Sequence, residues 1–156
     1  LSVERTRLAD CGADTIGLSG GLDGDIARGL RSGLTEEATE LWAEYQNNIE
    51  GNFFIELSRT DRTGERDYEA KALDLAAREG APLVATNAMR FLAPSDFEAH
   101  EIRTCIHQGR VLDDPRRPRA FTSRQYLRTP SEMASLFSDL PHKLPNCRQT
   151  RQNTLR

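Results

Sequence analysis

Polar side chains that could take part in chemistry follow an apolar run at residues 82–86. Thr86 and Asn87 end this run, and Ala88 and Arg90 come directly after them. A short apolar strand that leads into a polar turn and then a helix places that turn at the C-terminal edge of an α/β sheet or barrel, where such folds hold their active sites. We therefore expect any functional residues of this chain at that edge.

Two further strand candidates also lead into polar or glycine-rich turns. The strand predicted at 52–57 contains Glu56 and is followed by Thr60, and a weaker one at 15–19 leads into a turn that contains Gly21. A carboxylate inside an apolar strand costs free energy unless it is paired or coordinated, so Glu56 is either a site residue or the partner of an arginine. The glycine turn matches neither phosphate-loop nor dinucleotide spacing, which indicates an ordinary strand-to-helix turn.

Side chains typical of nucleophiles and metal ligands are few and scattered. His100 has no second histidine at metal-ligand spacing, so we expect a hydrogen-bonded structural residue, and Cys105 on the same predicted helix is expected to be a small buried apolar group. Neither GxSxG nor HExxH occurs. The mixed-charge run at 113–119 predicts a surface loop whose charges pair with one another. Contact with DNA or a partner protein, helped by Arg124 and Arg128, is the alternative.

The elements that must position these residues alternate between strands and helices. Four helices are predicted from apolar periodicity and terminal signals. The first is capped by Thr35, and the second runs from about Asp67 to Gly80. The third begins at a Ser95–Glu98 capping box and ends at Gly109, and the fourth begins at a Thr129–Glu132 capping box with Pro130 at its first helical position. The alternation predicts an α/β fold with a parallel sheet. Three such units cannot close a barrel of seven or eight, so an incomplete domain is favoured over a small open sheet.

Composition restricts the class of protein. A chain of 156 residues with 29% charged and 37% hydrophobic residues suits one soluble domain, and a net charge of −3 argues against electrostatic binding of nucleic acid by the whole chain. No run is long enough to span a membrane, and the first residues contain no apolar signal core. Cys11, Cys105 and Cys147 lie far apart, which suits reduced thiols. These features predict a cytoplasmic protein with no membrane partner.

Taken in order, these turns and their surrounding elements resemble the polymerase-and-histidinol-phosphatase (PHP) domain of the bacterial DNA polymerase III alpha subunit. The resemblance covers about residues 18–140. The matching segments are Leu18–Gly21, Phe53–Leu57, Pro82–Asn87, Ala99–Ile102, Gly109 with Leu112–Pro115, and Tyr126–Phe137. The resemblance implies that the parallel strands are part of a distorted (β/α)7 PHP barrel at the N-terminus of a much longer polymerase.

The resemblance also implies a lost metal site. Active PHP domains hold several metal ions and remove nucleotides in the 3′→5′ direction, and ligand positions of the family correspond here to Gly21, Thr60, Ala88 and Arg90. Metal ions need carboxylate, imidazole or thiolate donors, and an arginine repels a cation. With Glu56, these positions form a vestigial site, so we expect no catalytic, cofactor-binding or metal-binding residue in this segment. Mg²⁺ is expected only in the polymerase site of a full-length protein.

The function implied by the resemblance is a non-catalytic PHP segment of a replicative polymerase, which gives structural support and a docking face. Its partners would be the remainder of the alpha chain, the proofreading exonuclease subunit, and the replisome and DNA through the full-length protein. One alternative is an active metal-dependent phosphoesterase that retains Glu56 and His100 and binds zinc or manganese. Another is an unrelated small α/β binding domain that is stable and monomeric by itself.

The two ends of the chain are expected to differ. Residues 1–141 are predicted to be a partial PHP domain. After Pro141 the family would continue in a regular helix, whereas the sequence here contains Pro145 and no apolar face. We interpret residues 142–156 as an atypical C-terminal tail, either disordered or produced by a frameshift.

Overall fold

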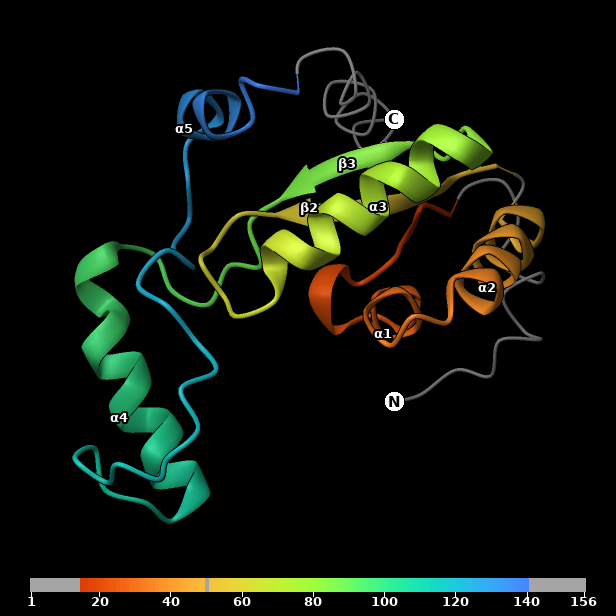
Figure 1. Ribbon diagram of the computed structural model, residues 1–156. Coiled ribbons are helices and arrows are strands. Elements are labelled where there is room, and N and C mark those ends of the chain that lie inside the picture. Colours follow the sequence, from red (N-terminus) through yellow and green to blue (C-terminus); the bar gives the residue numbers. More distant parts are fainter. Residues whose placement is uncertain (1–14, 50, 141–156) are drawn as a thin grey trace.

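Three parallel strands form the centre of the structure (Figure 1). The computed structural model describes residues 15–49 and 51–140, so the predicted tail at 142–156 lies outside the described residues. The strands are β1 (Gly17–Leu18), β2 (Phe53–Ser58) and β3 (Leu83–Thr86), in the order β1-β2-β3. The α/β class with parallel strands is confirmed, and within the described ranges the sheet has three strands.

One face of the central strand is buried and the other face is partly covered. Phe53, Ile55 and Leu57 share the buried face, whereas Phe54 and Glu56 point to the other face and are half-buried. The strand pairs with β1 on one side and with β3 on the other. Both longer strands are apolar runs bounded by turn residues, and each was predicted within one residue of its observed ends.

The described residues also form five α-helices and two short 3-10 turns. They are α1 (Asp25–Arg31), α2 (Thr35–Asn48), α3 (Glu65–Glu79), α4 (Phe97–Gln108) and α5 (Pro130–Leu136), with short 3-10 turns η2 (Gly21–Asp23) and η3 (Pro94–Asp96). The helix α1 was not predicted. It has only seven residues, but Ile26, Ala27 and Leu30 share one face and are buried. That i, i+4 spacing was the available signal.

Two predicted helix caps are wrong. Thr35 is the first residue of α2 rather than its cap. Ser95 does not cap α4, because Pro94 opens a 3-10 turn in which the Asp96 carboxylate accepts a hydrogen bond from the backbone N–H of Ala93 at 2.9 Å. A proline is well suited to the first position of a helical turn, so the 3-10 turn is capped at Ala93 and α4 begins after Asp96.

The predicted C-terminal glycines and the last capping box are confirmed, whereas α3 begins at Glu65, two residues before its predicted start. Gly80 and Gly109 end α3 and α4 in the left-handed conformation, with φ of 67° and 63°. The Thr129 hydroxyl accepts from the N–H of Glu132 at 3.3 Å, and the Glu132 carboxylate accepts from the N–H of Thr129 at 2.7 Å. This reciprocal pair is the capping box expected for α5.

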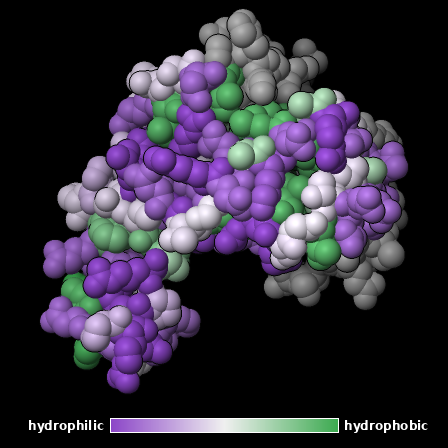
Figure 2. Space-filling view, viewed as in Figure 1, coloured by the Kyte–Doolittle hydropathy of each residue, from purple (hydrophilic) through white to green (hydrophobic). Residues whose placement is uncertain are grey.

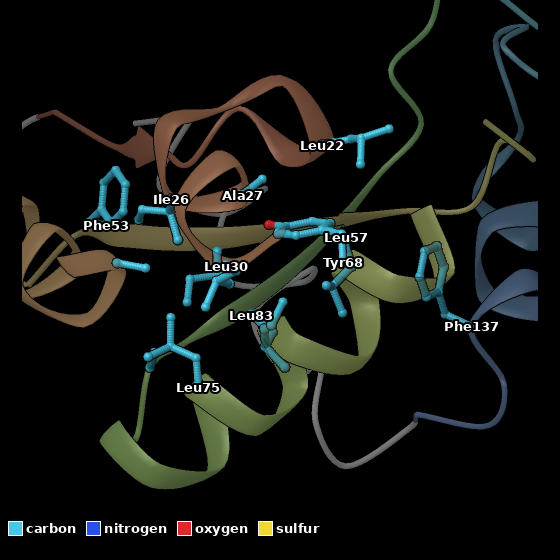
Figure 3. Packing of buried hydrophobic residues seen from close by; sticks show 14 of the residues in the cluster. Leu22, Ile26, Ala27, Leu30, Phe53, Leu57, Tyr68, Leu75, Leu83 and Phe137 are labelled. Carbon is cyan, nitrogen blue, oxygen red and sulfur yellow. The ribbon is translucent and has the colours of Figure 1, made fainter. Parts of the chain in front are cut away.

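The main core lies between the sheet and the helices α1 and α3 (Figure 3). Ile26 and Leu30 from α1, Leu75 from α3 and Leu57 from β2 all belong to this core, each at 2% exposure or less. Burial of each such side chain contributes about 1.5–3 kcal/mol before entropy is subtracted. The core therefore fixes the strand ends that carry the polar turns.

The helix α4 lies apart from the sheet, and residues 110–121 return along it (Figure 1). Glu101 and Arg117 join the two in a buried ion pair, with side-chain exposures of 6% and 8%. Cys105 is buried on the same side, as predicted. Asp114 pairs with Arg116, which confirms the self-paired loop, whereas the burial of Arg117 was not foreseen.

Arg59 fastens α5 to α3 from the end of β2. Its five N–H groups all donate: two to Glu69, two to Asp139 and one to the carbonyl of Leu136. The guanidinium also lies 4.7 Å from the ring centre of Phe137. The hydrogen bonds from Arg59 hold the pKa of the Asp139 carboxyl below its ordinary value.

We expect Arg59→Lys to loosen α5, because an ammonium group cannot make two forked contacts and stack on a ring at once. The expected loss is about 1–2 kcal/mol of unfolding free energy, together with faster protease cleavage within residues 126–140. The exposed Arg78→Lys is the matched control. Urea unfolding and limited proteolysis that do not separate the two variants would contradict this role of Arg59.

No helix within residues 15–49 and 51–140 is both long and apolar enough to cross a membrane.

Candidate functional site

The C-terminal ends of β1 and β2 are tied together by buried hydrogen bonds. The Ser19 hydroxyl accepts from the backbone N–H of Glu56 at 2.9 Å, and the Tyr68 hydroxyl of α3 donates to the Glu56 carbonyl at 2.9 Å. Ser19 and Tyr68 are 5% and 2% exposed. The backbone of Glu56 is therefore fixed from both sides, at the edge where the sequence predicts the site.

Burial raises the pKa of Tyr68 to about 12, with the nearby Glu56 charge acting in the same direction. The folded protein thus keeps the neutral phenol after the unfolded chain has begun to ionise at its ordinary value of 10.0. Stability should be unaffected by this group below pH 10 and should fall by about 2–3 kcal/mol between pH 10 and about 12. Urea unfolding at stepped alkaline pH measures this loss.

Tyr68→Phe provides the control for the alkaline effect. The variant should be less stable at neutral pH, because the Glu56 carbonyl loses a buried donor, but its alkaline loss should be smaller. Tyr126 will leave a residual slope, since its hydrogen bond to Glu132 also raises the pKa of that phenol. Equal slopes in the two proteins would contradict the assignment to Tyr68.

Glu56 and Gly21 are neighbours at this edge. A Cβ built on Gly21 would lie 3.9 Å from the Cβ of Glu56, and Gly21 has a φ of 52°, in the left-handed region. The Glu56 side chain is half-buried. Within the described residues its carboxylate makes no ion pair, so the arginine partner considered from the sequence is not found there.

Thr60 belongs to a closed hydrogen-bond network around Glu65. Thr60 is fully buried, and both its N–H and its hydroxyl donate to the Glu65 carboxylate, at 2.7 and 2.5 Å. The Ser58 hydroxyl and the Arg62 N–H donate to the same carboxylate at 3.1 and 3.2 Å. Four donors occupy this buried carboxylate, whose own exposure is 4%. We call these four residues the Glu65 network.

An arginine–aspartate pair lies beside this network. The Arg62 guanidinium donates to both carboxylate oxygens of Asp23, at 2.7 and 2.8 Å. This fork, with further attraction from Arg90 and Arg31, holds the pKa of the Asp23 carboxyl below its ordinary value of 3.8. The charge of Arg90 therefore acts at the site edge, although its side chain is exposed and lies over the ring of Phe121.

Ala88 and Asn87 are fixed by a segment that arrives from much later in the chain. Gln125 is fully buried. Its side-chain NH₂ group donates to the Ala88 carbonyl at 3.1 Å, and its backbone carbonyl accepts from the Arg90 N–H at 2.8 Å. The Asn87 side chain donates to the Tyr126 carbonyl and accepts from Arg128. Ala88 itself has a φ of 38°, which is rare for a residue with a side chain.

His100 lies on α4 among aromatic rings. Its ring centre is 5.6 Å from that of Phe91 and 4.7 Å from that of Phe121. Its Nδ1 is buried and has no hydrogen-bond partner within the described part of the chain. The expected hydrogen-bonded role is therefore wrong, because the residue acts as an aromatic packing group.

The strand ends thus bring together most of the positions singled out from the sequence. Gly21 lies beside Glu56, Thr60 is hydrogen-bonded to Glu65, and Ala88 and Arg90 are hydrogen-bonded to Gln125. Among residues 15–49 and 51–140, no three His, Cys, Asp or Glu side chains are arranged to hold a metal ion. Gly21 and Ala88 offer no side-chain donor to a metal ion, and the Thr60 hydroxyl already donates to Glu65.

The fold and this edge define an α/β segment whose strand ends are closed by hydrogen bonds and ion pairs. Comparison with known proteins assigns the segment to a family. The DNA polymerase III alpha subunits of Pseudomonas aeruginosa and Escherichia coli K12 are each 44% identical to this chain over 144 residues, which is 92% of it. The Haemophilus influenzae subunit is 47% identical over 129 residues, 83% of the chain. No protein-family model matches the chain.

The chain is therefore homologous to a segment of the DNA polymerase III alpha subunit, and the family predicted from the sequence is confirmed. It spans about 12% of the length of the P. aeruginosa and E. coli relatives.

Proposed function

We propose that this chain is a non-catalytic segment of a replicative DNA polymerase III alpha subunit, which braces the polymerase and offers a docking face to the proofreading exonuclease subunit. Homology over 92% of the chain supports the parent assignment. In this proposal the full-length protein performs template-directed DNA synthesis with Mg²⁺, within the replisome. No step of that reaction is assigned to residues of this segment.

The Glu65 network is the observation that best supports the absence of catalysis. Thr60 stands at a position where the family places a metal-ligating histidine. Its hydroxyl donates to the Glu65 carboxylate, which accepts three other hydrogen bonds. Beside it, the Arg62 guanidinium forms an ion pair with the Asp23 carboxylate. A metal ion at this edge would have to displace buried hydrogen bonds, each of which is costly to leave unmade.

The proposal also makes the sheet part of a distorted (β/α)7 barrel. Parallel sheets occur almost only with both faces covered and usually contain more than three strands. The edge strand β1 has only two residues, which supports further strands from the rest of the alpha chain. The barrel would then place β1, β2 and β3 as neighbouring strands with their polar turns on one rim.

A chimeric polymerase tests this proposal. The matched segment of the P. aeruginosa alpha subunit is replaced by this chain, and primer extension and binding of the exonuclease subunit are measured. We expect extension within about tenfold of the parent, a difference of only about 1.4 kcal/mol, and retained exonuclease binding. A soluble chimera that extends no primer contradicts the parent assignment, and one that extends primers without binding the exonuclease contradicts the docking role.

A further inference from the structure

The helix α4 carries an apolar stripe on the side away from its packed residues. Glu101 and Cys105 face the returning loop and are each 4% exposed, whereas Ile102 and Ile106 are 43% and 74% exposed. Residues four apart lie on the same side of a helix. Ile102 and Ile106 therefore form one outward stripe, separate from the buried side.

Two further exposed apolar residues flank the helix in the sequence. Leu92, just before the helical turn that leads into α4, is 71% exposed, and Val111, just after the helix, is 70% exposed. By contrast, the longer α3 contributes none of the large exposed apolar side chains in the described residues. In Figure 2 this outlying lobe is mostly hydrophilic, with apolar groups at its outer edge. Single exposed apolar residues are ordinary, but two isoleucines on the same side of one helix, with further exposed apolar residues before and after it, indicate a contact surface.

The length of the relatives indicates what covers this surface. The matched segments, which include α4, make up about 12% of the P. aeruginosa and E. coli subunits, so most of each polypeptide lies outside the match. A surface in the same polypeptide meets the stripe at a far higher effective concentration than a separate molecule does. Weak apolar contacts then suffice to cover it, which favours the rest of the chain over a second copy.

We propose that the outward face of α4, formed by Ile102 and Ile106, docks on a part of the alpha-subunit polypeptide outside this segment. The inference rests on the proposed function, because it takes the segment to be embedded in a longer alpha subunit. The occupant is an apolar surface of that polypeptide, and α4 anchors the segment to it.

Cysteine labelling in the chimeric polymerase tests the docking. Ile106→Cys is compared with Gln108→Cys, an exposed position about 160° round the same helix. Each variant is made in this chain alone and in the chimera, and maleimide labelling of that peptide is followed by mass spectrometry. Cys105 is buried and serves as the internal slow reference.

We expect Ile106→Cys to react at least about tenfold more slowly in the chimera than in the chain alone, because labelling there requires the contact to open. Gln108→Cys should react at similar rates in both. Equal labelling of Ile106→Cys in an active chimera overturns the docking and leaves the proposed function standing. A chimera that extends no primer contradicts the proposed function, and the docking falls with it.

Discussion

Glu65→Gln should destabilise this chain by about 2–4 kcal/mol and leave it largely unfolded at modest urea concentration. The Glu65 carboxylate accepts four hydrogen bonds from Ser58, Thr60 and Arg62 in a site that is 4% exposed. A glutamine keeps the shape but offers one acceptor oxygen, and its NH₂ group faces donors. At least one buried N–H or O–H then loses its partner.

The control for this variant is Asp74→Asn on the same helix. Asp74 is 67% exposed and makes only a 3.5 Å pair with Arg78, so its loss should change the unfolding free energy by less than about 0.5 kcal/mol. Urea unfolding followed by circular dichroism compares the two variants with the unchanged chain. If Glu65→Gln were as stable as Asp74→Asn, the Glu65 network could not be what closes this strand end.

Gly24→Ala should destabilise the first strand-to-helix turn by about 3 kcal/mol or more. A Cβ at this position would lie 1.8 Å from the backbone oxygen of Ser19 and 2.9 Å from its carbonyl carbon. Backbone atoms cannot move away by changing a rotamer, so the turn must open. That movement would shift Ser19, whose hydroxyl holds the backbone of Glu56.

Gly80→Ala separates this steric effect from the general cost of replacing a glycine. Nothing lies within 4 Å of a Cβ at Gly80, but its φ of +67° strains any other residue by about 1–2 kcal/mol. Thermal and urea unfolding should therefore give Gly24→Ala a clearly lower free energy of unfolding than Gly80→Ala. The reverse order would mean that the turn before α1 is not built as described.

The parts of the fold that the sequence predicts well are those with strong local signals. Both longer strands are apolar runs bounded by turns, and Gly80, Gly109 and the Thr129 capping box mark helix ends directly. The helix α1 was missed because its seven residues lie in a glycine-rich stretch, where turn signals outweigh a short apolar pattern. The misplaced caps at Thr35 and Ser95 show that a capping residue type does not fix its position when a proline or another turn precedes the helix.

The site could be predicted in location but not in its bonding. Gly21, Glu56, Thr60, Ala88 and Arg90 do follow the strand ends. Their partners could not be predicted. Gln125 bonds to Ala88 across 37 residues, and Glu65 at the start of α3 accepts from Thr60 in the loop that follows β2. Such pairings depend on how the elements pack, which local patterns do not encode.

Metal content and nuclease activity of this chain test the account most directly. After incubation with zinc or manganese and desalting, plasma mass spectrometry should find far less than one metal ion per chain, and a labelled oligonucleotide should lose no 3′ nucleotides. This result is predicted because Gly21 and Ala88 offer no metal ligand and the polar groups of the Glu65 network are bonded to one another. One or more tightly held ions per chain, with metal-dependent release of 3′ nucleotides, would contradict the claim that this segment is non-catalytic.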